Sequence, residues 1–170
     1  MRCIMISLLI LVFLTPHLFA VVGAPSPQAK NEAAKGHWST WRGPNRDGLS
    51  AETGLLSSWQ ERRPKLAWKV KGLGNGLSSV AVTEGRIYTM GKRDGAIKMI
   101  ALNSKGGAKI WESDIGSESN EGPNSTPSVD SDRVYGLTHA GRLVCVNTTD
   151  GSILWRRHLP TDFKGEMESG

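Results

Sequence analysis

The side chains best able to do chemistry are Cys145 and the histidines His37, His139 and His158. Metal and redox sites place such ligands at short spacings, as in C-x-x-C or H-E-x-x-H, and the sequence has neither pattern. The three histidines are far apart in the sequence, and nothing beside Cys145 would lower its thiol pKa. We therefore predict no metal ligands and no catalytic residue in this chain, and we expect Cys145 to be a small apolar filler.

Three further stretches contain residues of the types that are found in binding sites. Residues 72–77 (GLGNGL) are similar to a dinucleotide-binding loop, but Leu77 replaces the third glycine and no strand–helix–strand unit surrounds it, so we predict a turn. Asp130 and Asp132 flank a predicted hairpin, where solvated carboxylates are usual. The remaining candidates to line a cofactor are polar residues ahead of a predicted strand: Glu118, Glu121 and Asn124. The cofactor-binding residues, if there are any, stay unknown at this point.

The composition is that of one modest globular domain. Of 170 residues, 38% are hydrophobic and 22% are charged, which excludes both a disordered tail and a multi-span membrane protein. The net charge of +5 is spread along the chain, so we expect no nucleic-acid partner. Because Cys3 falls in an N-terminal apolar segment, Cys145 is the only mature cysteine, and an intrachain disulfide framework is excluded.

Residues 1–24 have the organisation of an export signal. Arg2 gives a positive start, an apolar run follows, and the small residues at 22–24 suit cleavage after Ala24, with Ala20 as the second choice. The apolar core is too short to be a good spanning helix, so we expect contact with the membrane only through this segment; an uncleaved N-terminal anchor is the alternative. The mature protein is predicted to be exported, periplasmic or extracellular.

Tryptophans recur at a nearly fixed interval after residue 66. Trp68, Trp111 and Trp155 are about 43 residues apart, and residues 125–135 align with residues 78–88. Each unit divides into four β-rich stretches separated by turn residues, in the second unit at about 125–130, 133–138, 142–147 and 152–157. Pro127 falls in the first of these, which we expect to be an edge strand because its missing N–H is tolerated there. Helix is nearly absent, and the period predicts β-propeller blades.

A second pattern relates the units to one propeller family. In each unit, a small residue, a glycine and a tryptophan occupy positions 1, 7 and 11: Ala101, Gly107 and Trp111, then Cys145, Gly151 and Trp155. This pattern resembles the tryptophan-docking motif of the PQQ-like (pyrroloquinoline-quinone-type) propeller repeat. The resemblance implies that each indole is wedged between adjacent blades, stacked on a flat peptide over the small residue of its neighbour. The resemblance also implies that Cys145 occupies the small-residue position that alanine occupies at Ala101.

The N-terminal region carries a further resemblance. Residues 38–50 (WSTWRGPNRDGLS) are similar to the W-x-x-W-R-G-P-x-R-x-G opening of a bacterial PQQ-like propeller group abundant in planctomycetes. Residues 122–129 resemble the lead into that group's second blade, and residues 162–167 the lead into a third.

These features predict an all-β fold: an incomplete β-propeller of about two four-stranded antiparallel blades plus an N-terminal closing strand at 65–70. We expect a signal peptide at 1–24, a linker at 25–37, the W-x-x-W-R-G-P segment at 38–64 and a partial propeller at 65–170, with blades at about 71–115 and 122–160 and the start of a third. Residues 68–170 hold roughly 2.4 units, whereas a closed ring needs at least about four. We therefore expect a fragment of a longer protein whose exposed blade flanks aggregate or pair with other chains.

Two functions remain open. The first is an exported, non-catalytic binding or scaffold module whose partner is an unknown protein or the remaining blades, with no cofactor in this chain. The alternative, implied by the resemblance, is the N-terminal part of a quinoprotein dehydrogenase in which PQQ bound with Ca²⁺ oxidises an alcohol. That alternative needs carboxylate and amide ligands for Ca²⁺, and such enzymes commonly carry a vicinal cysteine pair. Neither is recognisable here, so we favour the binding module.

Overall fold

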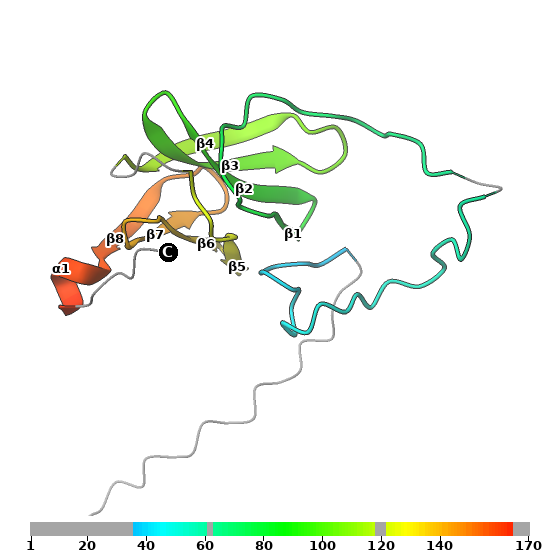
Figure 1. The fold of residues 1–170 in the computed structure, drawn as a ribbon, viewed down its shortest axis with the longest axis horizontal. Coiled ribbons are helices and arrows are strands. Elements are labelled where there is room, and N and C mark those ends of the chain that lie inside the picture. Colours follow the sequence, from blue (N-terminus) through cyan, green and yellow to red (C-terminus); the bar gives the residue numbers. More distant parts are fainter. Residues whose placement is uncertain (1–35, 61–62, 118–121, 165–170) are drawn as a thin grey trace, which may run out of the picture.

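The computed structural model describes residues 36–60, 63–117 and 122–164, and its core is two four-stranded antiparallel sheets lying side by side (Figure 1). Each sheet follows the chain in order. The first contains β1 (Ala81–Thr83), β2 (Arg86–Arg93), β3 (Ala96–Asn103) and β4 (Lys109–Gly116). The second contains β5 (Ser128–Asp130), β6 (Arg133–Leu137), β7 (Arg142–Asn147) and β8 (Ile153–His158). The predicted all-β fold of two four-stranded antiparallel blades is confirmed.

Short turns with positive φ set the register of the first sheet. Glu84 and Gly85 join β1 to β2, and Asp94 and Gly95 join β2 to β3, all four with φ between 50° and 77°. Two-residue turns of this kind match the right-handed twist of the strands that they connect.

One cross-strand row recurs in both sheets. Tyr88 pairs with Ala101, which pairs with Trp111; Tyr135 pairs with Cys145, which pairs with Trp155. The two aromatic rings meet across the small residue, with ring centroids 5.9 Å apart in the first sheet and 6.0 Å in the second. A larger side chain in the middle of the row would force these rings apart, which is why the position takes Ala or Cys.

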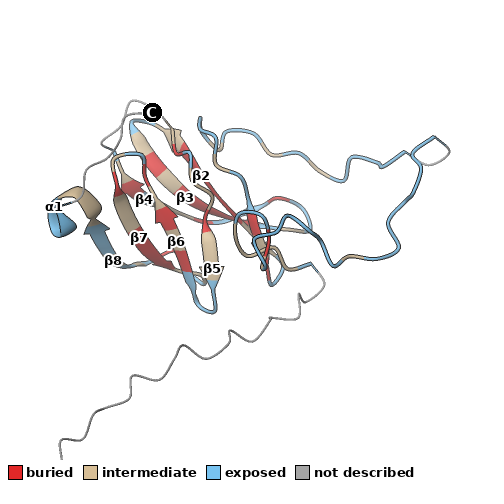
Figure 2. Ribbon diagram, turned by 60° about the horizontal axis from the view of Figure 1, so that its bottom comes forward, coloured by how far each residue is buried: buried red, intermediate tan, exposed pale blue. Residues whose placement is uncertain are grey.

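The main core fills the space between the two sheets, where buried positions of β6 and β7 face the first sheet (Figure 2). The first sheet contributes Met90 and Met99, and the second contributes Val134, Val144 and Val146. Gly136 on β6 makes this packing possible, because a Cβ there would lie 2.4 Å from the Met99 methyl and 2.8 Å from the Met90 sulfur.

Three details differ from the predicted strands. β5 begins at Ser128, so the buried Pro127 lies just before the strand and not inside it. Residues 65–70 have no strand assignment, and no described residue pairs with them in a ladder. A five-residue helix, α1 (Leu159–Phe163), follows β8, with Pro160 in its first turn. No helix within the described ranges is long and apolar enough to cross a membrane.

Candidate functional site

The seam between the sheets is built around Trp111 on β4. Its side chain is 7% exposed and lies against the turn between β7 and β8 of the second sheet. The indole Nε1 donates a hydrogen bond to the main-chain carbonyl of Thr148 at 2.8 Å. Gly151 has a φ of +78°, and a Cβ at this residue would lie 2.8 Å from the Trp111 ring. The glycine therefore supplies both the turn conformation and the space for the indole.

Trp68 repeats this arrangement on the first sheet. Its Nε1 donates to the carbonyl of Ser104 at 3.1 Å, and a Cβ at Gly107 (φ +72°) would lie 2.8 Å from its ring. Ser104 and Thr148 both stand three residues after the small residue of the motif. The segment at 65–70 thus places its tryptophan as a preceding blade would, although it forms no ladder.

Within the docking motif, the glycine and the small residue make different contacts. Gly107 and Gly151 contact the indole that arrives from the preceding segment, and the indole bonds to the carbonyl ahead of each glycine. Ala101 and Cys145 instead separate the tyrosine and the tryptophan of their own sheet. The carbonyl that accepts the indole hydrogen bond was not predicted, because a main-chain acceptor leaves no signature in side-chain types.

We call the face of the second sheet that points away from the first sheet the outer docking face. Among the described residues, no further sheet covers it as the second sheet covers the first. Its members are Tyr135, Leu137, Leu143, Cys145 and Trp155. By strand register they correspond to Tyr88, Met90, Met99, Ala101 and Trp111 of the first sheet, all of which are buried. In the second sheet, every member except Cys145 is partly exposed. The same row of side chains is therefore a seam in one sheet and an open surface in the other.

Cys145 lies at the centre of the outer docking face and is fully buried. Burial raises the pKa of its thiol above the usual value, and nearby Arg133 only partly offsets this. A protonated, buried thiol is a poor nucleophile. The geometry gives Cys145 a packing position opposite Trp155.

The N-terminal segment joins the first strands of both sheets. Trp38 exchanges two main-chain hydrogen bonds with Val82 of β1, at 2.7 and 2.8 Å. The carbonyl of the next residue, Ser39, accepts from the amide of Val129 on β5 at 2.8 Å. Gly43 (φ +81°) lies against the Trp38 ring, where a Cβ would be 2.8 Å away. We call residues 38–40 the strap, because they hold both sheets along one edge.

Of the other polar candidates, residues 72–77 lie in a loop, Asp132 lies in a turn and Asp130 is the last residue of β5. Residues 72–77 form a loop, as predicted, whose Asn75 bonds to Lys92 and whose Leu77 amide donates to the carbonyl of Pro123 at 2.9 Å. Asp132 pairs with the exposed Arg133 at 3.6 Å. Glu118 and Glu121 lie outside the described residues. Within the described ranges, no three His, Cys, Asp or Glu residues are grouped as a metal site would require.

A family model and solved structures resemble this chain. The family model described as outer membrane protein assembly factor BamB matches residues 44–169. BamB from Moraxella catarrhalis is 20% identical, over 54% of this chain and 27% of that chain, with a TM-score of 0.39. Quinohemoprotein alcohol dehydrogenase ADHIIG from Pseudomonas putida HK5 is 24% identical, over 59% of this chain and 16% of that chain, with a TM-score of 0.45.

A europium-containing methanol dehydrogenase is 20% identical, over 47% of this chain and 15% of that chain, with a TM-score of 0.38. This chain therefore spans at most 27% of the length of these structures. No curated protein matches the chain.

Proposed function

Because this chain belongs to the PQQ-like β-propeller repeat family, whose model is described as outer membrane protein assembly factor BamB, we propose that it is an exported, non-catalytic binding or scaffold module. One observation carries the proposal. The first sheet buries its Trp111 row under the second sheet, whereas the equivalent row of the second sheet forms the partly exposed outer docking face. A contiguous apolar surface of this kind marks an interaction site.

The partner that fits the outer docking face is a further four-stranded sheet of the same repeat. Trp155 has the position of Trp111, but no described residue accepts a hydrogen bond from its Nε1. A matching partner offers what the second sheet offers to Trp111: a glycine with positive φ and a main-chain carbonyl three residues before it. Such a sheet comes from further repeats of the same protein or from another propeller chain.

Self-association of the full exported chain tests this proposal. We expect oligomers in light scattering at micromolar concentration, because the outer docking face offers a ready apolar contact. Trp155→Ser should shift the population toward monomer, whereas Trp59→Ser should not, since Trp59 is 64% exposed in a loop far along the chain from that face. A monomer with a sharp, reversible melting transition and no dependence on Trp155 would overturn the proposal.

The dehydrogenase alternative has its own direct test. Under the binding-module proposal, titrating the purified chain with PQQ and Ca²⁺ gives no saturable binding, and the mixture does not support dye-coupled alcohol oxidation. Saturable binding together with oxidation would replace the proposed function by a quinoprotein enzyme.

Export belongs to the same proposal and depends on residues 1–24. The support is the order of a positive start, an apolar core and small residues before Ala24. N-terminal sequencing of the protein from the periplasm or the medium should begin at Pro25. A chain that keeps Met1 and fractionates with membranes would favour the uncleaved anchor.

A further inference from the structure

The first sheet also has a face that points away from the second sheet, and we call it the Trp68 face. Its central residues Thr89, Ile100 and Leu102 are only 7%, 0% and 3% exposed. No described sheet lies on this face, although its residues are as buried as those of the seam. By strand register they correspond to the residues of the second sheet that pack against the first sheet: Gly136, Val144 and Val146.

Residues 65–71, which we call the plug, lie where a preceding sheet would pack on the Trp68 face. Trp68 donates to the carbonyl of Ser104, and a Cβ at Gly107 would lie 2.4 Å from a methyl of Val70. Apart from the bond to Ser104, no hydrogen bond joins the plug to any other described residue. Trp68 is partly exposed, so the plug fills this site less completely than a sheet would.

The chain on either side of the plug allows it to leave the face. After the plug, the loop at 72–77 is anchored to β2 by two main-chain hydrogen bonds between Asn75 and Lys92. Gly72, with a φ of +77°, stands at the junction between the plug and this anchored loop. Before the plug, residues 63 and 64 are exposed and have no regular secondary structure. The plug can therefore turn about Gly72 without disturbing the sheets.

The indole sites on the two sheets are equivalent. Each consists of a glycine with positive φ, +72° at Gly107 and +78° at Gly151, and of a main-chain carbonyl three residues before that glycine. The site at Gly107 holds Trp68, and the site at Gly151 holds Trp111. The same chain thus carries an indole without a partner, Trp155, and a matching indole site that only the plug occupies.

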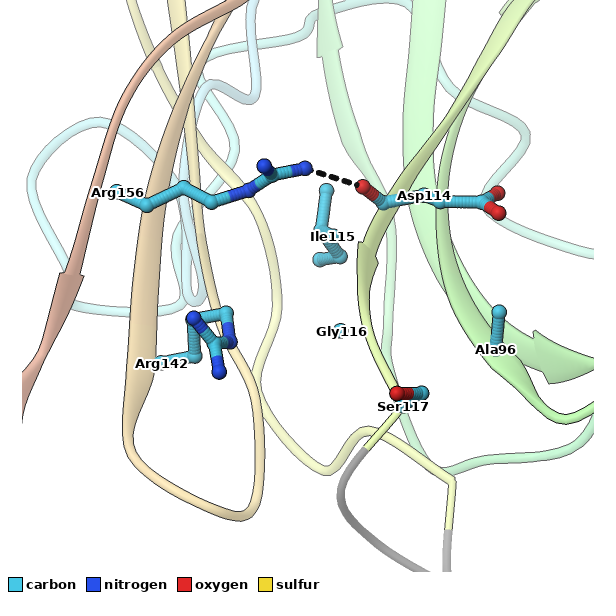
Figure 3. Close-up of a pocket in the computed structure, with 7 residues that line it drawn as sticks. All are labelled: Ala96, Asp114, Ile115, Gly116, Ser117, Arg142 and Arg156. Carbon is cyan, nitrogen blue, oxygen red and sulfur yellow. Dashed lines mark hydrogen bonds between the residues drawn. The ribbon is translucent and has the colours of Figure 1, made fainter.

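The seam inside the chain shows what a seam between two copies would keep and lose. Besides the bond of Trp111, Arg156 donates from Nη2 to the main-chain carbonyl of Asp114 at 2.9 Å, which is the dashed line in Figure 3. On the first sheet, Glu112 has the register position of Arg156, and a carboxylate cannot donate such a bond. A seam on the Trp68 face would therefore keep the tryptophan bond and lack the arginine bond, which makes it the weaker of the two.

We propose that the outer docking face of one copy binds the Trp68 face of a second copy, head to tail, once the plug has left. Trp155 then takes the place of Trp68 and donates to the carbonyl of Ser104 in the second copy. This inference rests on the proposed function, because it names the partner of the outer docking face. The plug and the neighbouring copy compete for one site, so the plug limits self-association. The two contacting faces differ, so further copies can add in the same way.

Sedimentation velocity of the full exported chain over a range of concentrations tests the proposal. Trp68→Ser should lower the dissociation constant of self-association about tenfold, because affinity is reduced in proportion to the time that the plug occupies the site. Trp68→Phe keeps a ring on the apolar face and loses only the donor, so it should fold as the wild type does and lower the constant by about threefold.

The double variant Trp68→Ser/Trp155→Ser separates docking from aggregation. It should be monomeric by itself, yet it should bind the wild-type chain, whose Trp155 can enter the open site, and it should not bind Trp155→Ser. Association of the double variant with itself would refute the proposal, since it would come from the uncovered Ile100 and Leu102 alone.

Two further results bear on the proposal and on the proposed function separately. Self-association that requires Trp155 but is unchanged by both Trp68 variants would rule out the head-to-tail contact and leave the binding module standing. Monomers at all concentrations in the wild type and in both Trp68 variants would count against both.

Discussion

The indole Nε1 of Trp111 donates a hydrogen bond to the main-chain carbonyl of Thr148, 2.8 Å away, and so fastens the last strand of the first sheet to a turn of the second. Trp68 makes the same bond to Ser104 in the preceding unit. The repeat is therefore a unit of contact between sheets as well as a unit of sequence, and its stability should depend on both partners of each contact.

Trp111→Phe should destabilise the protein by roughly 1–3 kcal/mol, because the ring shrinks and the donor to Thr148 is lost. Trp155→Phe should cost less than about 0.5 kcal/mol, since Trp155 is partly exposed. Urea denaturation followed by far-ultraviolet circular dichroism measures both. Equal losses would mean that the seam adds nothing beyond the contacts of each tryptophan within its own sheet.

Gly151→Ala should cost more stability than Gly95→Ala. Both glycines have nearly the same φ, +78° and +77°, so both variants carry the backbone penalty of about 1 kcal/mol for a left-handed alanine. Only at Gly151 would the new Cβ approach the Trp111 ring, at 2.8 Å, whereas nothing lies within 4 Å at Gly95.

Displacing the indole should add roughly 1–3 kcal/mol to the cost of Gly151→Ala and shift tryptophan fluorescence to the red. Urea denaturation and emission spectra of the two variants provide the measurement. Identical stability losses with unchanged emission would show that the turn, and not the indole, requires this glycine.

The sequence allowed the sheets to be predicted because their determinants are local and repeated. Turn residues such as Asp150 and Gly151, β-branched strands and the tryptophan interval all lie within one unit, so three of the four strands predicted in the second unit, at 133–138, 142–147 and 152–157, fall within one residue of β6, β7 and β8. In the structure, Gly107 and Gly151 of the docking motif lie against the rings of Trp68 and Trp111.

The strap and the hydrogen bond from Arg156 to the carbonyl of Asp114 could not be predicted, because each depends on residues brought together from separate elements. Trp38 meets Val82 and Ser39 meets Val129 through main-chain atoms, which any residue type could supply. Arg156 reaches the carbonyl of Asp114 only once both sheets are in place. The predicted strand at 65–70 has no described partner, and an isolated stretch cannot form a ladder whatever its propensity.

Cys145 should react slowly with Ellman's reagent in the folded protein and rapidly in urea. The side chain is fully buried and its thiol pKa is raised by burial, so both access and thiolate formation are suppressed. The protonated thiol contributes to the free energy of unfolding at pH values below its unfolded pKa of about 8.5. This contribution is lost as the pH rises through the higher pKa of the folded state.

Cys145→Ala should keep the fold at a cost of about 1 kcal/mol or less, because alanine fills the equivalent place at Ala101. Chemical denaturation of this variant and the rate of labelling of the wild type are the measurements. Labelling as fast in the folded as in the unfolded protein would contradict the packing position assigned to the thiol.

Trp38→Ala should loosen the strap, and Trp41→Ala should not. The Trp38 ring packs on Gly43 and holds the segment that bonds to both sheets, whereas Trp41 is 62% exposed. Native-state hydrogen exchange should show the amides of Val82 and Val129 exchanging about tenfold faster in Trp38→Ala. Unchanged protection of these two amides would mean that the main-chain bonds hold the strap without the ring.

Glu112 should make the stability of the first sheet depend on acid pH. Burial raises the pKa of its carboxyl, but hydrogen bonds from Arg93 and Lys109 outweigh burial and leave the pKa below its usual value. The folded state therefore binds the proton less tightly than the unfolded state. The contribution of the Glu112 carboxylate to the free energy of unfolding is therefore present at pH values above the unfolded pKa of about 4.3. It is lost as the pH falls through the lower pKa of the folded state.

When the pH is lowered from 7 to 3, the wild type should consequently lose more stability than Glu112→Gln. The difference between the two losses should be less than about 1 kcal/mol, because Lys109 and part of Arg93 are exposed to solvent. Urea midpoints at the two pH values measure the difference. Arg93→Gln should reduce the pH dependence more in the wild-type background than in Glu112→Gln, where Arg93 keeps only its 3.2 Å ion pair with the exposed carboxylate of Asp94. If Arg93→Gln changed the pH dependence equally in both backgrounds, the effect would come from other carboxylates, and the ion pair between Arg93 of β2 and Glu112 of β4 would have no part in it.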